Sequence, residues 1–262
     1  MKRYTRGFYS GMPIMKEYLI TFDTDWVSDS IIKEVRDYLI DNEIKSTWFI
    51  THDSPEIRKL FDYPTLFELG MHPNFCEGST QGNTPREVMR YLQKIVPQAK
   101  SVRMHSLVQS SPLLKMMQEE FNILYDVSLL LPYTEGITPH EIFYSKNVSL
   151  LRLPYFWEDD LEMYRPNPCF SLTNNKYHVD GIKIFNFHPI HIVLNSYSME
   201  NYYLCKSKVD IRKCSLSELQ KYINTSGEGT GTFFKELVQF NKNNHFPGLT
   251  ISELAFKWRS IK

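Results

Sequence analysis

The sequence predicts an α/β fold built on a parallel sheet, either open or closed into a barrel. In the first half of the chain, short apolar and β-branched segments alternate with amphipathic helical patterns, which is typical of β-α units. The 262 residues are 42% hydrophobic, enough for the core of an undivided α/β barrel of about 200–250 residues. We find no repeats or linkers, and we expect one domain over residues 1–262.

The first strand is expected at Tyr18–Asp23, where apolar and β-branched residues run straight into two carboxylates. A helix follows at Ser28–Leu39, because its apolar residues share one helical face. Thr47–Thr51 is expected as the second strand, and Ser54-Pro55 supplies the cap and first-turn proline of the next helix. Leu66–Met71 suits a third strand, although its apolar spacing would also suit a short helix.

The remaining elements are less regular. Residues 84–87 form a capping box that opens a helix to about Val96. The further elements expected are the strands Ser101–Met104, Phe121–Asp126, Ile142–Tyr144, Ser149–Leu153 and Ile182–Phe187, and the helices Pro112–Glu120, Ser215–Ile223 and Thr232–Phe240. We expect a turn at Lys146-Asn147. The glycine-rich segment 226–231 lacks the Lys-Ser/Thr ending of a phosphate-binding loop and is expected to be a flexible loop.

Composition excludes several classes of protein. Thirty basic and thirty acidic residues give a net charge of zero, which argues against binding to nucleic acid or membrane by bulk charge. The four cysteines are widely spaced and are expected to be free thiols in a reducing compartment. No stretch approaches the roughly 18 apolar residues of a membrane span, and no apolar signal segment follows the basic N-terminus. We therefore expect a cytoplasmic protein without a membrane span.

Residues capable of chemistry follow the predicted strands. They are Asp23, Asp25, His72, Arg103, His105, Asp126, His188 and His191. Because the carboxyl ends of parallel strands meet at one rim, residues far apart in sequence can share a site there. Two carboxylates with neutral imidazoles suit a zinc-like divalent ion that keeps an open position for water.

Several of these residues also have a purely structural interpretation. The acidic pair at 23 and 25 suits an Asx turn followed by a helix N-cap. Asp126 would equally cap the turn that follows it, and Arg103 would anchor a surface carboxylate. We expect His52 and His191 to be surface or satisfied core residues. His72 and His188 each precede proline, which favours an extended backbone and a side chain that points along the rim.

Four segments, in this order along the chain, resemble the motifs of the NodB-homology polysaccharide deacetylases (carbohydrate esterase family 4), and more closely those of the divergent WbmS-like subgroup associated with bacterial surface-polysaccharide gene clusters. They are Thr21-Phe-Asp-Thr-Asp25, Gly70-Met-His-Pro-Asn74, Val102-Arg-Met-His105 and Asn186-Phe-His188-Pro. The resemblance spans about residues 18–194. It implies a distorted (β/α) barrel and metal-dependent removal of an N- or O-acetyl group from a sugar.

The resemblance also implies roles for individual residues. Asp23 corresponds to the catalytic base and Asp25 to a metal ligand, with an exchange of the two left open. Arg103 corresponds to the arginine that pairs with the base and keeps it ionised. His188 corresponds to the general acid, which Asp126 would orient.

The family's second motif contains two metal-binding histidines four residues apart, and here only His72 matches. Cys76 stands at the other position, with Asn74 between them. His105 is the preferred third ligand, since it lies two residues past Arg103 and therefore on the same side of that strand. Cys76 is the alternative, and its thiolate would favour zinc over harder ions. Zn2+ is the expected ion.

Two rival functions remain open. The missing second histidine motivates a non-catalytic member of the same fold that binds a glycan or a partner. Another metal-dependent amidohydrolase or phosphoesterase would need a second metal and an early H-x-H pair, but the H-x-x-H at His188 and His191 comes late. A serine hydrolase is disfavoured because the chain has no G-x-S-x-G sequence.

The expected substrate is a sugar or glycan precursor, nucleotide- or lipid-linked, because the chain is neutral and shows no export signal. Aromatic residues near the rim would form either a sugar-stacking wall or part of the core. They are Trp26, Phe75, Tyr155, Phe156 and Trp157.

Overall fold

The computed structural model describes residues 18–144 and 148–260. Within them, nine strands form one sheet in the order β6-β7-β5-β4-β3-β2-β1-β9-β8. The strands are β1 (Leu19–Asp23), β2 (Ser46–Ile50), β3 (Phe67–Met71), β4 (Ser101–Val102), β5 (Tyr125–Asp126), β6 (His140–Phe143), β7 (Ser149–Arg152), β8 (Trp157–Glu158) and β9 (Ile184–Phe187). All neighbouring pairs are parallel except β6 and β7. The sheet curls into a half-barrel, with β6 and β8 at its two edges.

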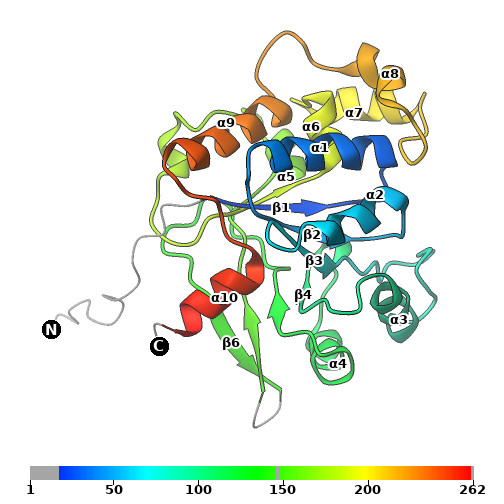
Figure 1. Ribbon diagram of the computed structural model, residues 1–262, viewed down its shortest axis with the longest axis vertical. Helices are drawn as coiled ribbons and strands as arrows, with labels where there is room; N and C mark the ends of the chain where they lie inside the picture. The colour runs from blue at the N-terminus through cyan, green and yellow to red at the C-terminus, as the bar shows by residue number, and fades with distance from the viewer. Residues whose placement is uncertain (1–17, 145–147, 261–262) are drawn as a thin grey trace, which may run out of the picture.

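Helices pack around this sheet (Figure 1). They are α1 (Asp29–Asp41), α2 (Pro55–Arg58), α3 (Pro85–Ile95), α4 (Ser111–Phe121), α5 (Asp159–Met163), α6 (Pro189–Leu194), α7 (Met199–Lys206), α8 (Leu216–Leu219), α9 (Thr230–Asn243) and α10 (Ile251–Arg259). Figure 1 shows α1, α6 and α9 on one side of β1, and α3, α4 and α10 around the part of the sheet that carries β4 and β6. In the described chain no helix is both long enough and apolar enough to cross a bilayer.

The centre of the sheet is formed by β1 and β2, in which every residue is buried. Such strands have helices or loops on both faces and therefore consist largely of apolar and β-branched residues. Phe22 of β1 stacks on Trp48 of β2 with ring centroids 4.3 Å apart. This packing holds β1 firmly in the sheet and so fixes the position of its C-terminal end, where Asp23 lies.

Strand register brings the functional segments side by side. Phe22 pairs with Phe187, and Met71 pairs with Val102. The residues that follow each pair therefore leave the sheet at the same level, which is the rim expected for the site of a parallel sheet.

Two predicted strands are shorter than expected. The strand predicted at Ser101–Met104 ends at Val102, because the Met104 amide donates to Ser128 Oγ (3.0 Å) and the chain turns into a 3-10 helix at His105–Leu107. The strand predicted at Phe121–Asp126 begins only at Tyr125, because Phe121 completes α4 and Asn122 caps it with a left-handed φ of 56°. The prediction extended both strands into neighbouring residues that are not paired in the sheet.

The second half contains elements that the sequence patterns did not indicate, namely β8, α5, α6, α7 and α10. The glycine-rich segment is also more ordered at its end than predicted: Gly229 caps α9, and a Cβ there would lie 2.3 Å from the Asn195 carbonyl oxygen. This close approach explains why residue 229 is glycine. The turn predicted at Lys146-Asn147 lies outside the described residues.

Candidate active site

Asp23 is the last residue of β1, and Asp25 follows it in a left-handed turn. Asp25 has a φ of 36° and Trp26 a φ of 56°, a region that few non-glycine residues adopt. The turn is held by Thr51, whose Oγ1 lies 3.0 Å from Thr24 Oγ1 and accepts the Trp26 amide (3.1 Å). The N-cap of α1 is Ser28, so neither aspartate caps this helix. The end of β1 places Asp23 at the rim, and the turn places Asp25 there.

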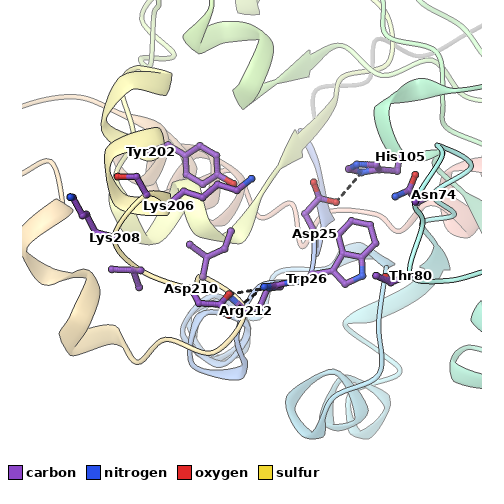
Figure 2. A pocket seen from close by; sticks show the side chains of 14 residues that line it. Asp25, Trp26, Asn74, Thr80, His105, Tyr202, Lys206, Lys208, Asp210 and Arg212 are labelled. Atoms are coloured by element: carbon purple, nitrogen blue, oxygen red, sulfur yellow. Dashed lines mark hydrogen bonds and ion pairs between the residues drawn. The ribbon is translucent and has the colours of Figure 1, made fainter.

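Asp25, His72 and His105 bring three donor atoms together. Asp25 Oδ1 lies 3.3 Å from His72 Nε2 and 3.3 Å from His105 Nδ1, and these two nitrogens are 3.3 Å apart. His72 Nδ1 donates to the Arg103 carbonyl oxygen (2.7 Å), so its Nε2 presents a lone pair to the cluster. Asp25 Oδ1 is buried and makes no well-aligned hydrogen bond. Figure 2 shows the Asp25 and His105 side chains facing each other.

This donor set fits a divalent ion. A tetrahedral ion with bonds of about 2.0–2.1 Å separates its ligand atoms by about 3.3 Å, which is the spacing of the three atoms here. One carboxylate and two imidazoles are also the ligands of many catalytic zinc sites, which leave a fourth position open.

The electrostatics of the cluster favour an ionised Asp25. Burial alone would raise the pKa of this carboxyl, but the contacts with His105 and His72 and the nearby His188 hold it well below its usual range. Asp25 therefore supplies a full negative charge to the cluster.

Asp23 lies next to this cluster, with its Oδ1 3.6 Å from His72 Nδ1, and its hydrogen bonds come from two other residues. Arg103 Nη1 donates to Asp23 Oδ1 (3.2 Å), and Asn186 Nδ2 donates to Asp23 Oδ2 (2.8 Å). The guanidinium of Arg103 lies between the rings of Phe49 and Tyr155, 4.5 Å from each centroid. Arg103 is fully buried, which rules out the alternative that it anchors a surface carboxylate.

His188 is held by Asp159 and not by Asp126. Its Nδ1 lies 2.7 Å from Asp159 Oδ1, and its backbone amide donates to Asp159 Oδ2 (2.8 Å). Its Nε2 lies 3.5 Å from Asp25 Oδ2. Burial lowers the pKa of His188, but the charges of Asp160 and Asp159 outweigh it and raise this pKa well above its ordinary value.

The prediction that Asp126 orients His188 is therefore wrong. Asp126 accepts from Arg152 Nε (2.6 Å) and from the Ser128 amide (3.0 Å). The local turn-capping interpretation of Asp126 is the one the structure supports, together with the Arg152 ion pair. Asp159 was missed because β8, which precedes it, has only two residues and gives no periodic signal.

Glu158 is a further carboxyl near Asp23, and it is half-buried. It accepts from the Tyr155 hydroxyl (3.0 Å) and from Asn186 Nδ2 (3.3 Å). Burial raises the pKa of Glu158 to about 7, with His188 opposing and Asp23 adding to the rise. The run of three acids at 158–160 is the sequence signal that could have drawn attention to it.

The raised pKa makes the protein less stable at high pH. An unfolded glutamate titrates near 4.5, so between that pH and about 7 the folded chain holds a proton that the unfolded chain has lost, and the free energy of unfolding falls as pH rises. The variant Glu158→Gln stays neutral at every pH. We therefore expect the free energy of unfolding of Glu158→Gln, relative to that of the wild type, to rise by about 2–3 kcal/mol when the pH is raised from 4.5 to 8. Urea denaturation in the presence of a chelator measures this gain. The exposed Glu34→Gln serves as control, and a pH-independent difference between Glu158→Gln and the wild type would contradict the assignment.

The other predicted residues lie at or outside the edge of the cluster. Cys76 is exposed, and its amide donates to Asn74 Oδ1 (2.9 Å). Cys76 belongs to no candidate metal cluster among the described residues, and Asn74 lines the cavity that Asp25 and His105 also line. His191 is buried, with its Nε2 2.9 Å from Asp160 Oδ1 and its Nδ1 3.1 Å from Ser196 Oγ. It is thus a satisfied core histidine, as expected.

The predicted aromatic wall is mostly core. Tyr155, Phe156 and Trp157 are buried. Trp26 lines a cavity of about 760 Å³ that also contains Asp25 and His105, and packs edge-on against the His105 ring with centroids 5.3 Å apart. Of the five aromatic residues, Trp26 is the one that borders this cavity.

Comparison with known proteins agrees with this architecture. A family model described as "WbmS-like: Polysaccharide deacetylase" matches residues 20–206. A crystal structure from Bordetella bronchiseptica, assigned as a polysaccharide deacetylase (WbmS) involved in O-antigen biosynthesis, is 30% identical, with a TM-score of 0.73 over 87% of this chain and 92% of that one. No curated protein matches the chain.

A family 4 acetyl xylan esterase from Clostridium thermocellum, solved with a cobalt ion, is 14% identical with a TM-score of 0.47, over 94% of this chain and 93% of that one. The family match confirms the predicted α/β fold of the polysaccharide-deacetylase type. The match covers β1 to α7, which contain every residue of the cluster described above. The chain therefore belongs to the WbmS-like family of polysaccharide deacetylases.

Proposed function

We propose that this protein removes an acetyl group, N- or O-linked, from a sugar by hydrolysis that depends on a divalent metal ion. The proposal rests on three features that lie together at one rim of the sheet: a cluster of metal-donor atoms, a carboxylate paired with an arginine, and a histidine paired with an aspartate. The donor atoms of Asp25, His72 and His105 lie within 3.3 Å of each other, beside an Arg-paired Asp23 and an Asp-paired His188.

Asp25, His72 and His105 would hold the ion, with Zn2+ favoured by their nitrogen and oxygen donors. When bound, the ion would polarise the acetyl carbonyl and lower the pKa of a water molecule. His105 takes the place of the missing second histidine in this assignment. Its position after β4, next to His72, supports it over Cys76, which is exposed.

Asp23 would act as the base that accepts a proton from the attacking water. Arg103 and Asn186 each donate one hydrogen bond to its carboxylate, and these two bonds fix the orientation of the carboxylate. Because Asp25 faces both imidazoles and Asp23 does not share that cluster, the geometry supports Asp23 as base and Asp25 as ligand over the reverse assignment.

His188 would act as the acid that protonates the leaving nitrogen or oxygen. Asp159 bonds to its Nδ1, which leaves Nε2 as the atom that carries the transferable proton toward the cluster. A protonated His188 is what general-acid catalysis needs, and the surrounding carboxylates favour that form.

The rival functions have less support. A two-metal hydrolase would need a second independent cluster, but the other two candidate groups in the described chain both include His188. In one of these groups Asp160 Oδ1 lies 3.8 Å from His188 Nδ1, but this nitrogen already forms a hydrogen bond with Asp159 Oδ1. A non-catalytic glycan-binding protein would have little need for the paired Asp23 and His188. This alternative also predicts that the purified protein binds no metal ion.

The proposal is tested by the release of acetate from acetylated sugars. We expect the zinc-loaded protein to release acetate from at least one member of a panel of N- and O-acetylated sugars, free and nucleotide-linked. Treatment with a chelator is expected to abolish this release, and addition of zinc to restore it. A wild-type protein that stays metal-free after zinc addition, shown by elemental analysis, would refute the proposed mechanism.

A further inference from the structure

The 760 Å³ cavity has two chemically different ends. Asp25 and His105 of the candidate metal cluster line one end. Basic side chains from α7 and the loop after it line the other, namely Lys206, Lys208 and Arg212. In Figure 2, Lys206 and Lys208 come from the side of α7, Asp25 and His105 lie on the opposite side, and Arg212 lies between them next to Trp26. A substrate that fills the cavity would contact both ends.

The positive charge at the basic end is only partly neutralised. Arg212 is paired with Asp210, whose Oδ1 lies 3.0 Å from Arg212 Nε. For Lys206 and Lys208, the described residues offer no carboxylate within salt-bridge distance. Asp25, the remaining acid in the cavity lining, belongs to the proposed metal cluster. The positive charges of Lys206 and Lys208 are therefore available to pair with a negatively charged group of a ligand.

Lys206 is directed into the cavity. It is the last residue of α7, and in Figure 2 its side chain extends from this helix toward Asp25. Its Nζ lies 5.5 Å from the centroid of the Tyr202 ring. Tyr202 in turn packs on the buried His191 with ring centroids 4.6 Å apart. The ammonium group thus rests on a ring that is anchored in the core.

We propose that the cavity binds an acetylated sugar that carries an anionic group, a phosphate ester or a carboxylate, and that Lys206, assisted by Lys208, holds this group. The inference rests on the proposed function, since it places the acetyl group at Asp25 and His105. Both lysine side chains are exposed to solvent, so water and salt screen their attraction for an oxyanion, and the charge-assisted contact is expected to be moderate and to weaken with salt.

The test compares neutral and anionic forms of one sugar. The probes are N-acetylglucosamine, its 1-phosphate, its UDP-linked form and the corresponding 2-acetamido uronic acid. Proton NMR on the zinc-loaded protein measures the dissociation constant of each probe, and the acetate methyl signal in the same sample measures hydrolysis. The variants are Lys206→Gln and, as matched control, Lys94→Gln, an exposed lysine of α3 outside the cavity.

We expect at least one anionic probe to bind about tenfold more tightly than N-acetylglucosamine. This preference is expected to shrink to about twofold in Lys206→Gln, to persist in Lys94→Gln, and to weaken as salt is raised. The phosphate and uronic-acid probes identify which anion is preferred. Equal affinity for neutral and anionic probes, or a preference that survives in Lys206→Gln, would overturn the inference.

The two proposals fail separately in this experiment. Acetate release without an anion preference would support the deacetylase and refute the anionic substrate. An anion preference that Lys206→Gln removes, without acetate release from any probe, would support the subsite and count against the proposed hydrolysis of these sugars.

Discussion

The variant His72→Ala is expected to lose the bound divalent ion, from about one ion per chain in the wild type to almost none, and to lose its deacetylase activity. In the proposed site His72 contributes one of three donor atoms from the described residues, and its ring is oriented by the Arg103 carbonyl. Loss of a group that merely orients a ligand costs about 10–100-fold in metal affinity, so loss of the ligand itself is expected to cost more. Elemental analysis after gel filtration measures the metal content.

Three further variants make this result specific. His140→Ala removes an exposed histidine of β6 and is expected to keep the ion. His105→Ala is expected to lose it, whereas Cys76→Ser is expected to keep it, which separates the two candidates for the third ligand. Circular dichroism shows whether each variant is folded. A folded His72→Ala protein that still carries one ion per chain would contradict the assignment of the site.

The variant Asp23→Asn is expected to lose activity and retain the metal ion. Removal of a general base costs about 10²–10⁴-fold in rate, and Asp23 lies outside the donor triangle of Asp25, His72 and His105. We expect kcat to fall by about this factor, with the metal content unchanged. Acetate release and elemental analysis on the same preparation measure both quantities.

The change at position 23 also affects the buried Arg103. This guanidinium is fully buried and loses its charged partner in Asp23→Asn, so a lower melting temperature is expected as well. Asp41→Asn, at the exposed end of α1, is the matched control and is expected to change neither rate nor stability. Loss of the metal from a folded Asp23→Asn protein would instead assign position 23 as a ligand.

The long central strands were predictable because their apolar runs are unambiguous. The first three strands were placed within about two residues of their observed bounds. The carboxyl-end rule then placed Asp25, His72 and His105 near one another, and the structure brings their donor atoms together. The reason given for His105 was only partly right, since the strand ends at Val102 and a 3-10 turn carries this histidine to the rim.

The partner of His188 was not predictable by the same reasoning. Asp126 also stands at the end of a strand, but its carboxylate is used by Arg152 and the Ser128 amide. Asp159 reaches His188 because β8 adds to the sheet next to β9, a pairing that involves only two residues of β8. Strand ends indicate which residues share a rim, whereas tertiary pairing decides which of them touch.

The left-handed turn after β1 limits which residues can serve at position 25. A side chain there must tolerate a φ of 36° as well as present an oxygen or nitrogen at the rim. Among non-glycine residues, asparagine, aspartate and histidine enter this region most readily, and β-branched or bulky residues are strongly disfavoured. The backbone therefore narrows the choice at this position before any question of metal affinity arises. With Asp25 as the proposed ligand, asparagine and histidine are the substitutions that would change the donor group and leave the turn intact, whereas glutamate, with the same charge, would strain it.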